Sequence, residues 1–326
     1  MKQFTITEND AGQRLDKFLK KIFPNASASL VYKINRKNKI KINGKKQDNE
    51  YKLQVWEEIK IFLNDDEFQT LSQKQEVKKE ESREKFDTKN IVYEDGDILV
   101  INKEPGINVH PGDYKTKESN IISQIQDYLW DKLNSLTFKP SLVHRIDRDT
   151  SGILIIWKKK NILTKLVADF KEHKKIQKVY YAIVLGKLPA SSGKIDKKLL
   201  RIEWAKNEDK VQISEKWQVA ISHYKVLKEH TIKTASGQQI ISEVEVEILT
   251  GRMHQIRVHM ASLGTPILWD NKYWDKAFNS YVAKNFWLTR QALHAWKIQF
   301  FHYWKQKNQR LEAKIKKDLT KILNEL

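Results

Sequence analysis

Residues 141–157, with the sequence SLVHRIDRDTSGILIIW, constrain the fold of this chain more than any other stretch. Residues 144–149 combine a histidine, two arginines and two aspartates, and the run 153–157 that follows is entirely apolar. The run is short, rich in β-branched residues and preceded by Gly152, which predicts a buried strand. A charged cluster joined directly to a core strand indicates a functional site rather than a solvated surface.

Asp147 stands inside this cluster, with Arg145 and Arg148 as its near neighbours in the chain. Cations within a few ångströms keep a carboxylate ionised and lower its pKa. An ionised carboxylate beside a core strand is a candidate catalytic group. The same spacing also suits a salt-bridged structural turn, and the residues of the cluster alone leave both interpretations open.

The charge of the chain predicts a polyanionic partner. Among 326 residues, Lys and Arg number 60 and Asp and Glu 41, which gives a net charge of +19 and a pI near 9.6. RNA or DNA is the first candidate for such a protein. The absence of cysteine excludes disulfides, thiolate nucleophiles and Cys-ligated metals. His254 and His259 lack the i,i+4 spacing of a helical metal pair, so we expect no metal site.

The chain contains no 18-residue apolar run and does not begin with a signal-peptide pattern. We therefore expect a cytoplasmic protein of two domains that does not contact a membrane.

Residues 1–63 have the pattern of a small α/β RNA-binding domain. Apolar residues recur at helical spacing in 14–23 and 30–34, and the segment 27–29 can cap the second helix. Asn43-Gly44 predicts a hairpin turn. Ten basic residues and no acidic one lie between Asp16 and Asp48, as on a phosphate-binding surface, although a solvated lysine-rich face has the same composition. The candidate RNA contacts are Lys33, Arg36, Lys37, Lys39 and Lys41.

Residues 64–90 predict a charged flexible linker. They include eight acidic and six basic residues, four large apolar ones, and neither Gly nor Pro. Such a segment has little to bury and remains solvated.

Residues 91–326 predict the larger domain. Apolar runs at 91–93, 98–102, 178–186 and 292–300 read as strands, and 243–250 alternates as a half-exposed antiparallel strand. Helical patterns cover 121–133, 161–173, 256–263 and 311–326. Gly106 should adopt positive φ in the turn after Lys103. Arg252 stands between the strand at 243–250 and the next helix, where side chains commonly line clefts.

Five motifs resemble the RluA family of pseudouridine synthases in both content and order. HRIDRDTSG at 144–152 is similar to the family signature HRLDRDTSG. The others are VYEDGDILVINKEPGINVHP, the strand with Lys-x-Tyr-x-Ala, LTGRMHQIRVHMASLGTPIL and ALHA. The resemblance implies an α+β protein whose catalytic domain is a mixed, mainly antiparallel sheet with flanking helices. It also implies isomerisation of uridine in RNA without any cofactor.

The resemblance also assigns roles to individual residues. It implies that Asp147 is catalytic, that Tyr180 stacks on the target base, and that Arg252 pairs with Asp147. By the same resemblance we expect Arg145 to occupy the space that a flipped base leaves, and His144 to contact RNA beside it.

Two further features concern the resemblance. Residues 12–45 resemble an S-four-like RNA-binding domain. Trp269-Asp270 and Tyr273-Trp274 stand where the family usually has Gly-Asp and Tyr-Gly. Trp in place of a glycine that needs positive φ should strain the turn unless the backbone has adapted.

Two other classes of function share some features with this sequence. A glycoside hydrolase also cuts a C1′ bond but needs two carboxylates across it, and Asp147 and Asp149 share one loop. An RNA-binding assembly factor with lost catalysis would explain the Trp substitutions, but not the joint presence of Asp147, Tyr180 and Arg252. We expect a monomeric synthase acting on large-subunit ribosomal RNA, with transfer RNA as the alternative substrate.

Overall fold

The computed structural model describes residues 1–72, 84–111, 119–133, 135–142, 144–160, 176–205, 208–234, 237–274, 280, 284–303 and 305–325. The chain divides into two compact units. The first comprises Met1–Phe86, Ile122–Ser141 and Trp157–Thr164, and the second comprises Asp87–Ile121, Leu142–Ile156 and Lys165–Leu326. The first unit thus takes in two stretches from the middle of the chain as well as its N-terminal residues.

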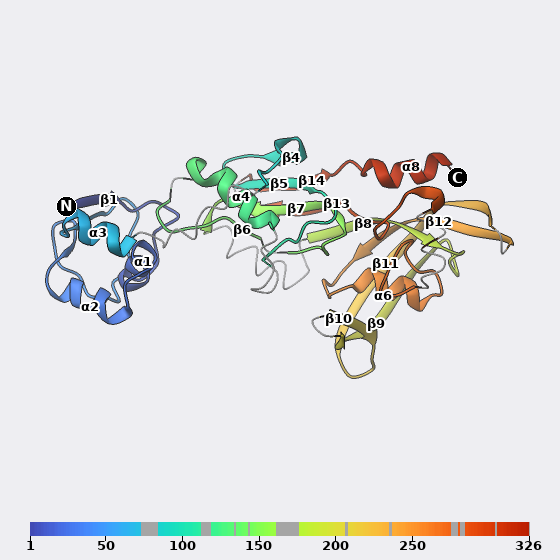
Figure 1. Cartoon of the computed structure of the whole chain (residues 1–326), viewed down its shortest axis with the longest axis horizontal. Coiled ribbons are helices and arrows are strands. Elements are labelled where there is room, and N and C mark those ends of the chain that lie inside the picture. The colour runs from blue at the N-terminus through green and yellow to red at the C-terminus, as the bar shows by residue number, and fades with distance from the viewer. Residues whose placement is uncertain are drawn as a thin grey trace. The chain divides into compact units, whose positions relative to one another are not determined.

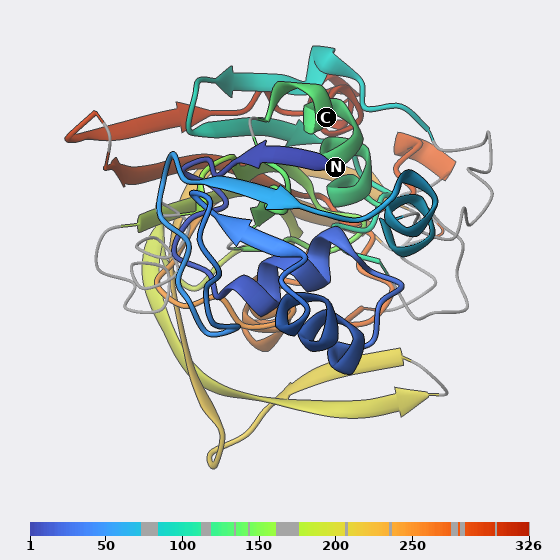
Figure 2. The ribbon, with the colours of Figure 1, turned by 90° about the vertical axis from the view of Figure 1, so that its left-hand side faces the viewer.

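The N-terminal part of the first unit is a three-stranded sheet, in the order β1-β3-β2, with two helices on one face (Figure 2). The strands are β1 (Lys2–Thr5), β2 (Ile40–Ile42) and β3 (Glu58–Ile61), and the helices are α1 (Leu15–Ile22) and α2 (Ala28–Arg36). The apolar stripes predicted for both helices are buried against the sheet, with Phe18 and Val31 among the core residues. Burial of one face of each helix explains why these segments are helical.

Local signals in this part behave as predicted. The Ser27 hydroxyl accepts a hydrogen bond from the Leu30 amide and caps α2. Asn43 and Gly44 both have positive φ, 48° and 77°, as a two-residue hairpin turn with inverted geometry requires.

The predicted linker begins too early. Residues Asp65–Ser72 form helix α3, and Phe68 and Leu71 pack against the core of the N-terminal domain. The Phe68 ring lies 5.4 Å from that of Phe23. Two apolar residues three apart suffice to attach a helical turn, which a composition average over 64–90 does not reveal. Residues 73–83 of the predicted linker lie outside the described residues.

A buried carboxylate joins two parts of the first unit that are far apart in sequence. Asp10 is fully buried and accepts hydrogen bonds from the backbone amides of Leu136 and Thr137 at 2.9 and 2.8 Å. The hydroxyls of Ser135 and Thr137 donate to it as well, at 2.9 and 2.7 Å. Since a buried carboxylate needs such donors, the segment 135–137 is a required part of this unit. Helix α4 (Ile121–Leu129), predicted over 121–133, precedes it and continues as the 3₁₀ turn η2 (Trp130–Lys132).

The second unit is built on one large sheet, with strand order β10-β9-β11-β12-β8-β13-β7-β5-β4 (Figure 1). The pairs β11–β12, β12–β8 and β8–β13 are antiparallel, and β13–β7 is parallel, so the sheet is mixed and mainly antiparallel as predicted. Its strands are β4 (Ile91–Glu94), β5 (Ile98–Lys103), β7 (Ser151–Trp157), β8 (Ile176–Leu185), β9 (Ser192–Ala205), β10 (Glu208–Ile213), β11 (Gln218–Thr234), β12 (Gly237–Ile248) and β13 (Leu293–His302), with β6 (Ser141–Leu142) beside β7 and β14 (Lys307–Glu312) beside β13. Helix α6 (Gln255–Ser262) packs on β9, β10 and β11.

The signature segment enters the sheet where β7 runs parallel to β13. Every residue of β7 is buried. Gly152 has φ +113° and pairs with Ala295, whose backbone oxygen would lie 2.2 Å from a Cβ at position 152. Next to this contact, the Ser151 hydroxyl and His294 Nδ1 are 2.8 Å apart and fully buried. Ser151-Gly152 of the signature and His294-Ala295 of the last motif therefore lie side by side where β7 and β13 pair.

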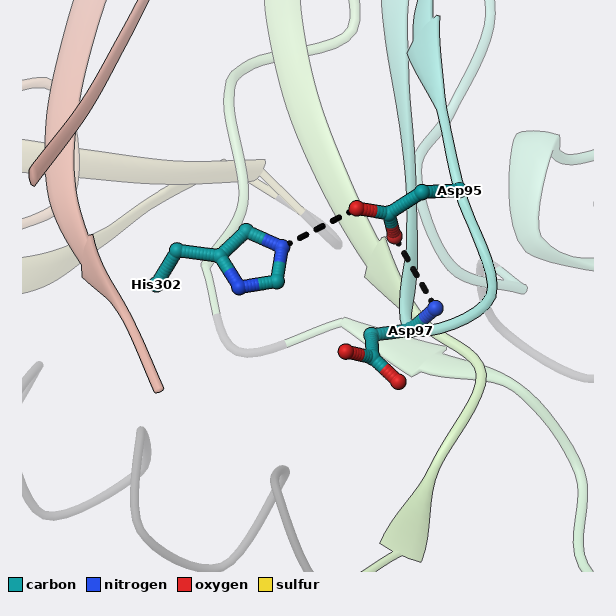
Figure 3. A group of neighbouring side chains, drawn as sticks. All are labelled: Asp95, Asp97 and His302. Atoms are coloured by element: carbon teal, nitrogen blue, oxygen red, sulfur yellow. Dashed lines mark hydrogen bonds and ion pairs between the residues drawn. The ribbon is translucent and has the colours of Figure 1, made fainter. Parts of the chain in front are cut away.

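The β4–β5 turn is attached to the end of β13 through Asp95 (Figure 3). Its carboxylate accepts hydrogen bonds from the amides of Asp97 and Ile98 and lies 3.1 Å from His302 Nε2. The ligand atoms of Asp95, Asp97 and His302 lie within 4.8 Å of one another, a metal-like spacing. However, the Lys305 ammonium and the Tyr93 hydroxyl already bind the Asp95 carboxylate, so the group serves as a structural link.

One predicted helix begins later than expected, and another cannot be compared with the structure. The helix predicted over 311–326 begins later, at α8 (Lys317–Glu325), because residues 307–312 form β14 on the edge of β13. The helix predicted over 161–173 lies outside the described residues. Among the helices that the structure describes, none is long and apolar enough to cross a membrane.

Candidate active site

A cavity of about 610 Å³ in the second unit contains the predicted catalytic residues. The signature loop contributes Asp147, β8 contributes Lys178 and Tyr180, and the N-cap and first turn of α6 contribute His254 and Arg257. The volume falls within the range of small-molecule sites. Of the described residues that line the cavity, Asp147 alone has a carboxylate, and several others are cationic.

The arginine that pairs with Asp147 is Arg257, and the predicted partner Arg252 is wrong. Arg257 Nη1 donates to Asp147 Oδ2 at 3.0 Å, whereas Arg252 Nε donates to the backbone oxygen of Val219 at 3.2 Å. The motif runs through the first turn of α6. Arg257, two residues inside the helix, points back toward the signature loop, while Arg252 precedes the helix and stays at the cavity wall.

A second carboxylate holds Arg257 in place. Asp270 is fully buried and accepts two hydrogen bonds from Arg257, at 2.7 Å from Nε and 2.9 Å from Nη2. This bidentate contact fixes the plane of the guanidinium, which leaves Nη1 directed at Asp147. Burial opposes the charge of Arg257, but its hydrogen bonds with Asp270 raise its pKa above the ordinary value.

Trp269, which stands where the resemblance has glycine, adopts a left-handed backbone conformation. Trp269 has φ +57°, in the left-handed region that the replaced glycine would favour. The turn closes with a hydrogen bond from the Asp270 amide to the Ile267 oxygen. A bulky residue in this conformation stores about 1–2 kcal/mol of strain, which the Arg257–Asp270 contact and the surrounding packing offset.

The two oxygens of Asp147 differ in their surroundings. Arg257 Nη1, Gln291 Nε2 at 3.4 Å and His254 Nε2 at 3.9 Å all face Oδ2. Within the residues that the structure describes, Oδ1 has no hydrogen-bond or ion-pair partner. The side chain is 26 % exposed. Oδ2 is thus the anchored oxygen, and Oδ1 is available for a reactant.

The electrostatics keep Asp147 ionised. Burial alone would raise its pKa, but His254, in its protonated form, and Arg257 hold the pKa below the ordinary value of a carboxyl. Burial lowers the pKa of His254 to about 4, so its ring is neutral near pH 7. Arg257 is therefore the permanent cation beside Asp147 at neutral pH.

Buried polar groups hold the signature loop from behind. The Lys103 ammonium donates to the backbone oxygens of Glu104, Ile107 and Arg148, at 2.7, 3.0 and 2.7 Å. Burial lowers its pKa to about 7. Gly106, in the turn between Glu104 and Ile107, has φ +84°, as predicted. These bonds tie the first motif to the loop that presents Asp147.

Gln291, two residues before β13, supports the same loop, since its amide donates to the Thr150 hydroxyl at 2.7 Å and approaches Asp147. Sequence reasoning missed Arg257, Asp270, Tyr273 and Gln291 as members of this site. The signal for Arg257 was available in the spacing of the helix-start motif, because positions 256 and 260 define the buried face and 257 adjoins it. The Asp270 and Gln291 contacts depend on distant chain segments.

Tyr180 lies on the same face of β8 as Lys178, in the cavity wall. Burial raises the pKa of its hydroxyl, so it stays neutral. Burial also lowers the pKa of Lys178 to about 8.

The predicted RNA contacts fall into two groups. In the cavity, Arg145 is exposed, whereas His144 Nε2 accepts a hydrogen bond from the Ile155 amide at 3.1 Å. Burial lowers the pKa of His144 to about 3, so this ring is a neutral support for β7. In the first unit, α2 and the segment after it present exposed cations, Lys33, Arg36, Lys37 and Lys39, and the half-buried Lys41 lies 5.5 Å from the Phe62 ring centre.

Residues 97–262 match the family model for RNA pseudouridylate synthase. "Ribosomal large subunit pseudouridine synthase C" of Buchnera aphidicola subsp. Baizongia pistaciae is 36 % identical, over 93 % of this chain and 90 % of that protein. The protein of the same name from Vibrio cholerae is 33 % identical over 98 % of this chain and 95 % of its own length.

Solved structures agree on the fold. "Human RNA Pseudouridylate Synthase Domain Containing 4" superposes with a TM-score of 0.58 at 23 % identity, over 73 % of this chain and 93 % of that one. "Human RNA Pseudouridylate Synthase Domain Containing 1" gives 0.53 at 23 % identity, over 69 % and 82 %. Motifs, fold and relatives over nearly the full length therefore agree, and the chain belongs to the RNA pseudouridylate synthase family.

Proposed function

We propose that this protein isomerises uridine to pseudouridine in large-subunit ribosomal RNA, in the cytoplasm and with Asp147 as the catalytic group. The observation that carries the proposal is the pairing of Asp147 Oδ2 with Arg257 in a cavity that leaves Oδ1 without a partner among the described residues. The choice of RNA is supported by the relatives, whose names state the ribosomal large subunit.

The reaction breaks the C1′–N1 bond of uridine, turns the detached uracil and joins its C5 to C1′. Asp147 can serve either by attacking C1′ or by taking the C2′ proton. Both routes need an ionised oxygen aimed at the ribose, and Oδ1 meets that need. Arg257 keeps the carboxylate charged and, through its bidentate bond to Asp270, fixed in direction.

Tyr180 offers its ring face to the uracil while the base is detached. Water must be kept out at that stage, because hydrolysis at C1′ would leave an abasic site. A paired uridine cannot reach a buried carboxylate, so it must be flipped out at a cost of a few kcal/mol. The exposed Arg145 at the cavity is placed to fill the space that the base leaves.

The N-terminal domain supplies RNA affinity in this proposal, as the S-four-like resemblance implies. Its exposed cations on and after α2 have no acidic partner among the described residues. Their phosphate contacts would help to offset the free energy of base flipping.

The test is Asp147→Asn against Asp149→Asn, in the full-length protein with a large-subunit ribosomal RNA transcript carrying [5-³H]uridine. Asn is nearly isosteric with Asp, so RNA binding should stay within about threefold of wild type, and tritium release should vanish for Asp147→Asn alone. Release by Asp147→Asn that matches wild type would overturn the catalytic assignment. Release from transfer RNA but not from ribosomal RNA would overturn the assigned substrate.

A further inference from the structure

Tyr273 lies between a sheet strand and the histidine beside Asp147. Its hydroxyl oxygen accepts a hydrogen bond from the Val211 amide on β10 at 2.8 Å. The same hydroxyl lies 2.8 Å from Nδ1 of His254. Burial raises the pKa of Tyr273, so the hydroxyl keeps its proton.

These contacts determine which nitrogen of His254 carries the proton. Since the Tyr273 oxygen already accepts from Val211, its own proton needs an acceptor, and among the described residues His254 Nδ1 is the one at hydrogen-bond distance. The ring is neutral near pH 7, because burial holds its pKa at about 4. Its single proton therefore resides on Nε2, which faces Asp147 Oδ2 at 3.9 Å.

We propose that His254, with its tautomer set by Tyr273, is a positioning residue that directs an Nε2–H at Oδ2 of Asp147 and so keeps Oδ1 turned toward the ribose. The inference rests on the proposed function of Asp147. With Arg257 Nη1 and Gln291 Nε2, the histidine completes a set of donors on one oxygen. The opposite tautomer would place a lone pair against the carboxylate and repel it. The 3.9 Å separation is longer than a hydrogen bond and can shorten when substrate binds.

The backbone conformation at His254 indicates that its side chain has a function. His254 has φ +51°, in the left-handed region, and it serves as the N-cap of α6 without a capping bond from its side chain. Asn adopts the left-handed conformation more readily than His. A strained residue at a functional site points to a requirement for its ring.

Two variants distinguish a role of the His254 ring from a role of its backbone. In His254→Gln the amide nitrogen can reach the position of Nε2, whereas in His254→Asn it falls near Nδ1. If the donor to Asp147 matters, the Gln variant should keep a kcat at least about tenfold above that of the Asn variant, with similar KM, since misdirected catalytic groups lose about 100-fold in rate. If His254 serves only the backbone or the cap, the Asn variant should be equal or better, which would overturn the inference.

A second measurement does not depend on activity. The ¹⁵N chemical shifts of the His254 ring, assigned by comparison with His254→Gln, distinguish a protonated nitrogen from one with a lone pair. The proposal expects the proton on Nε2 in the full-length protein and a partial shift of the proton to Nδ1 in Tyr273→Phe. A proton on Nδ1 in the wild type would overturn it. If the wild-type protein releases no tritium from ribosomal RNA, the proposed function fails instead, and the tautomer result stands independently.

Discussion

Gly152 and Ala295 approach so closely that no side chain fits between them: a Cβ on Gly152 would lie 2.2 Å from the Ala295 oxygen and 2.6 Å from its nitrogen. The contact is between backbone atoms, where β7 and β13 pair in parallel, and a change of rotamer cannot relieve it. The glycine of the signature thus allows the catalytic loop and the last motif to meet, with Ser151 bonded to His294 alongside.

Gly152→Ala should therefore destabilise the protein severely. We expect a loss of at least about 4 kcal/mol in the free energy of unfolding, since the side chain both overlaps backbone atoms and demands positive φ. Urea unfolding followed by tryptophan fluorescence would measure it. Gly96→Ala is the matched control, because a Cβ there meets nothing within 4 Å, and it should change stability by less than about 1 kcal/mol. Equal effects of the two substitutions would contradict the packing argument.

Arg257→Lys should lower kcat by about 100-fold, because an ammonium cannot hold Asp270 at two points and still reach Asp147. Arg252→Lys changes a side chain whose Nε bonds the backbone oxygen of Val219, and kcat should stay within about threefold of wild type. Single-turnover rates on ribosomal RNA would compare the two. A larger loss in Arg252→Lys would restore the pairing that the motif alone suggested.

Trp269→Val should be less stable than Trp269→Gly by about 1–2 kcal/mol, because a β-branched residue at φ +57° is strained and glycine is not. Thermal unfolding of both variants would provide the comparison. A more stable Val variant would mean that side-chain packing, rather than backbone conformation, decides what position 269 tolerates.

Stability should fall as the pH drops below about 6.5. Burial lowers the pKa of four histidines, to about 3 for His144 and about 4 for His254, His259 and His294. Between these values and 6.5 the unfolded chain binds protons that the folded protein does not, so each histidine removes up to about 1.4 kcal/mol of stability per pH unit.

His259→Asn tests this dependence, since it removes one titrating group that is fully buried. The pH slope of the free energy of unfolding between pH 4.5 and 6 should decrease by about one proton, or 1.4 kcal/mol per pH unit. An unchanged slope would show that His259 is protonated in the folded protein.

Substituting Lys33 and Lys37 by Gln should weaken RNA binding and flatten its salt dependence. Both side chains are exposed, Lys33 in the last turn of α2 and Lys37 at its C-cap. If each contacts a phosphate, the slope of log K against log salt should fall in magnitude by about 1.4–1.8. Lys2 and Lys60, which pair with Asp65 and Glu58, form the control pair and should leave the slope unchanged. The same slope in both double variants would remove the RNA-binding role from α2.

Local signals in the sequence predicted local structure well. The buried strand after Gly152, the cap at Ser27 and the turn at Asn43-Gly44 all depend on neighbours within a few residues, and each was predicted correctly. Asp147 and Tyr180, singled out by their resemblance to family motifs, both line one cavity, and their roles stay predictions.

Contacts between distant segments were harder to predict. Arg252 and Arg257 are both in one motif, and only the direction of α6 relative to the signature loop decides which reaches Asp147. The attachment of α3 likewise depends on where Phe68 meets Phe23, and strand β14 depends on the open edge of β13. A pattern within one segment does not contain such information.

The buried Asp10 has a consequence for the order in which the protein can form during synthesis. Its partner amide on Thr137 lies 127 residues further along the chain. At about 5–20 residues per second, that residue is made roughly 6–25 seconds after Asp10. Until then the carboxylate lacks four of its donors and must remain hydrated. The N-terminal domain therefore leaves the ribosome without the segment that binds Asp10. The first unit can therefore become complete only after the ribosome has translated residues 87–121, which belong to the second unit.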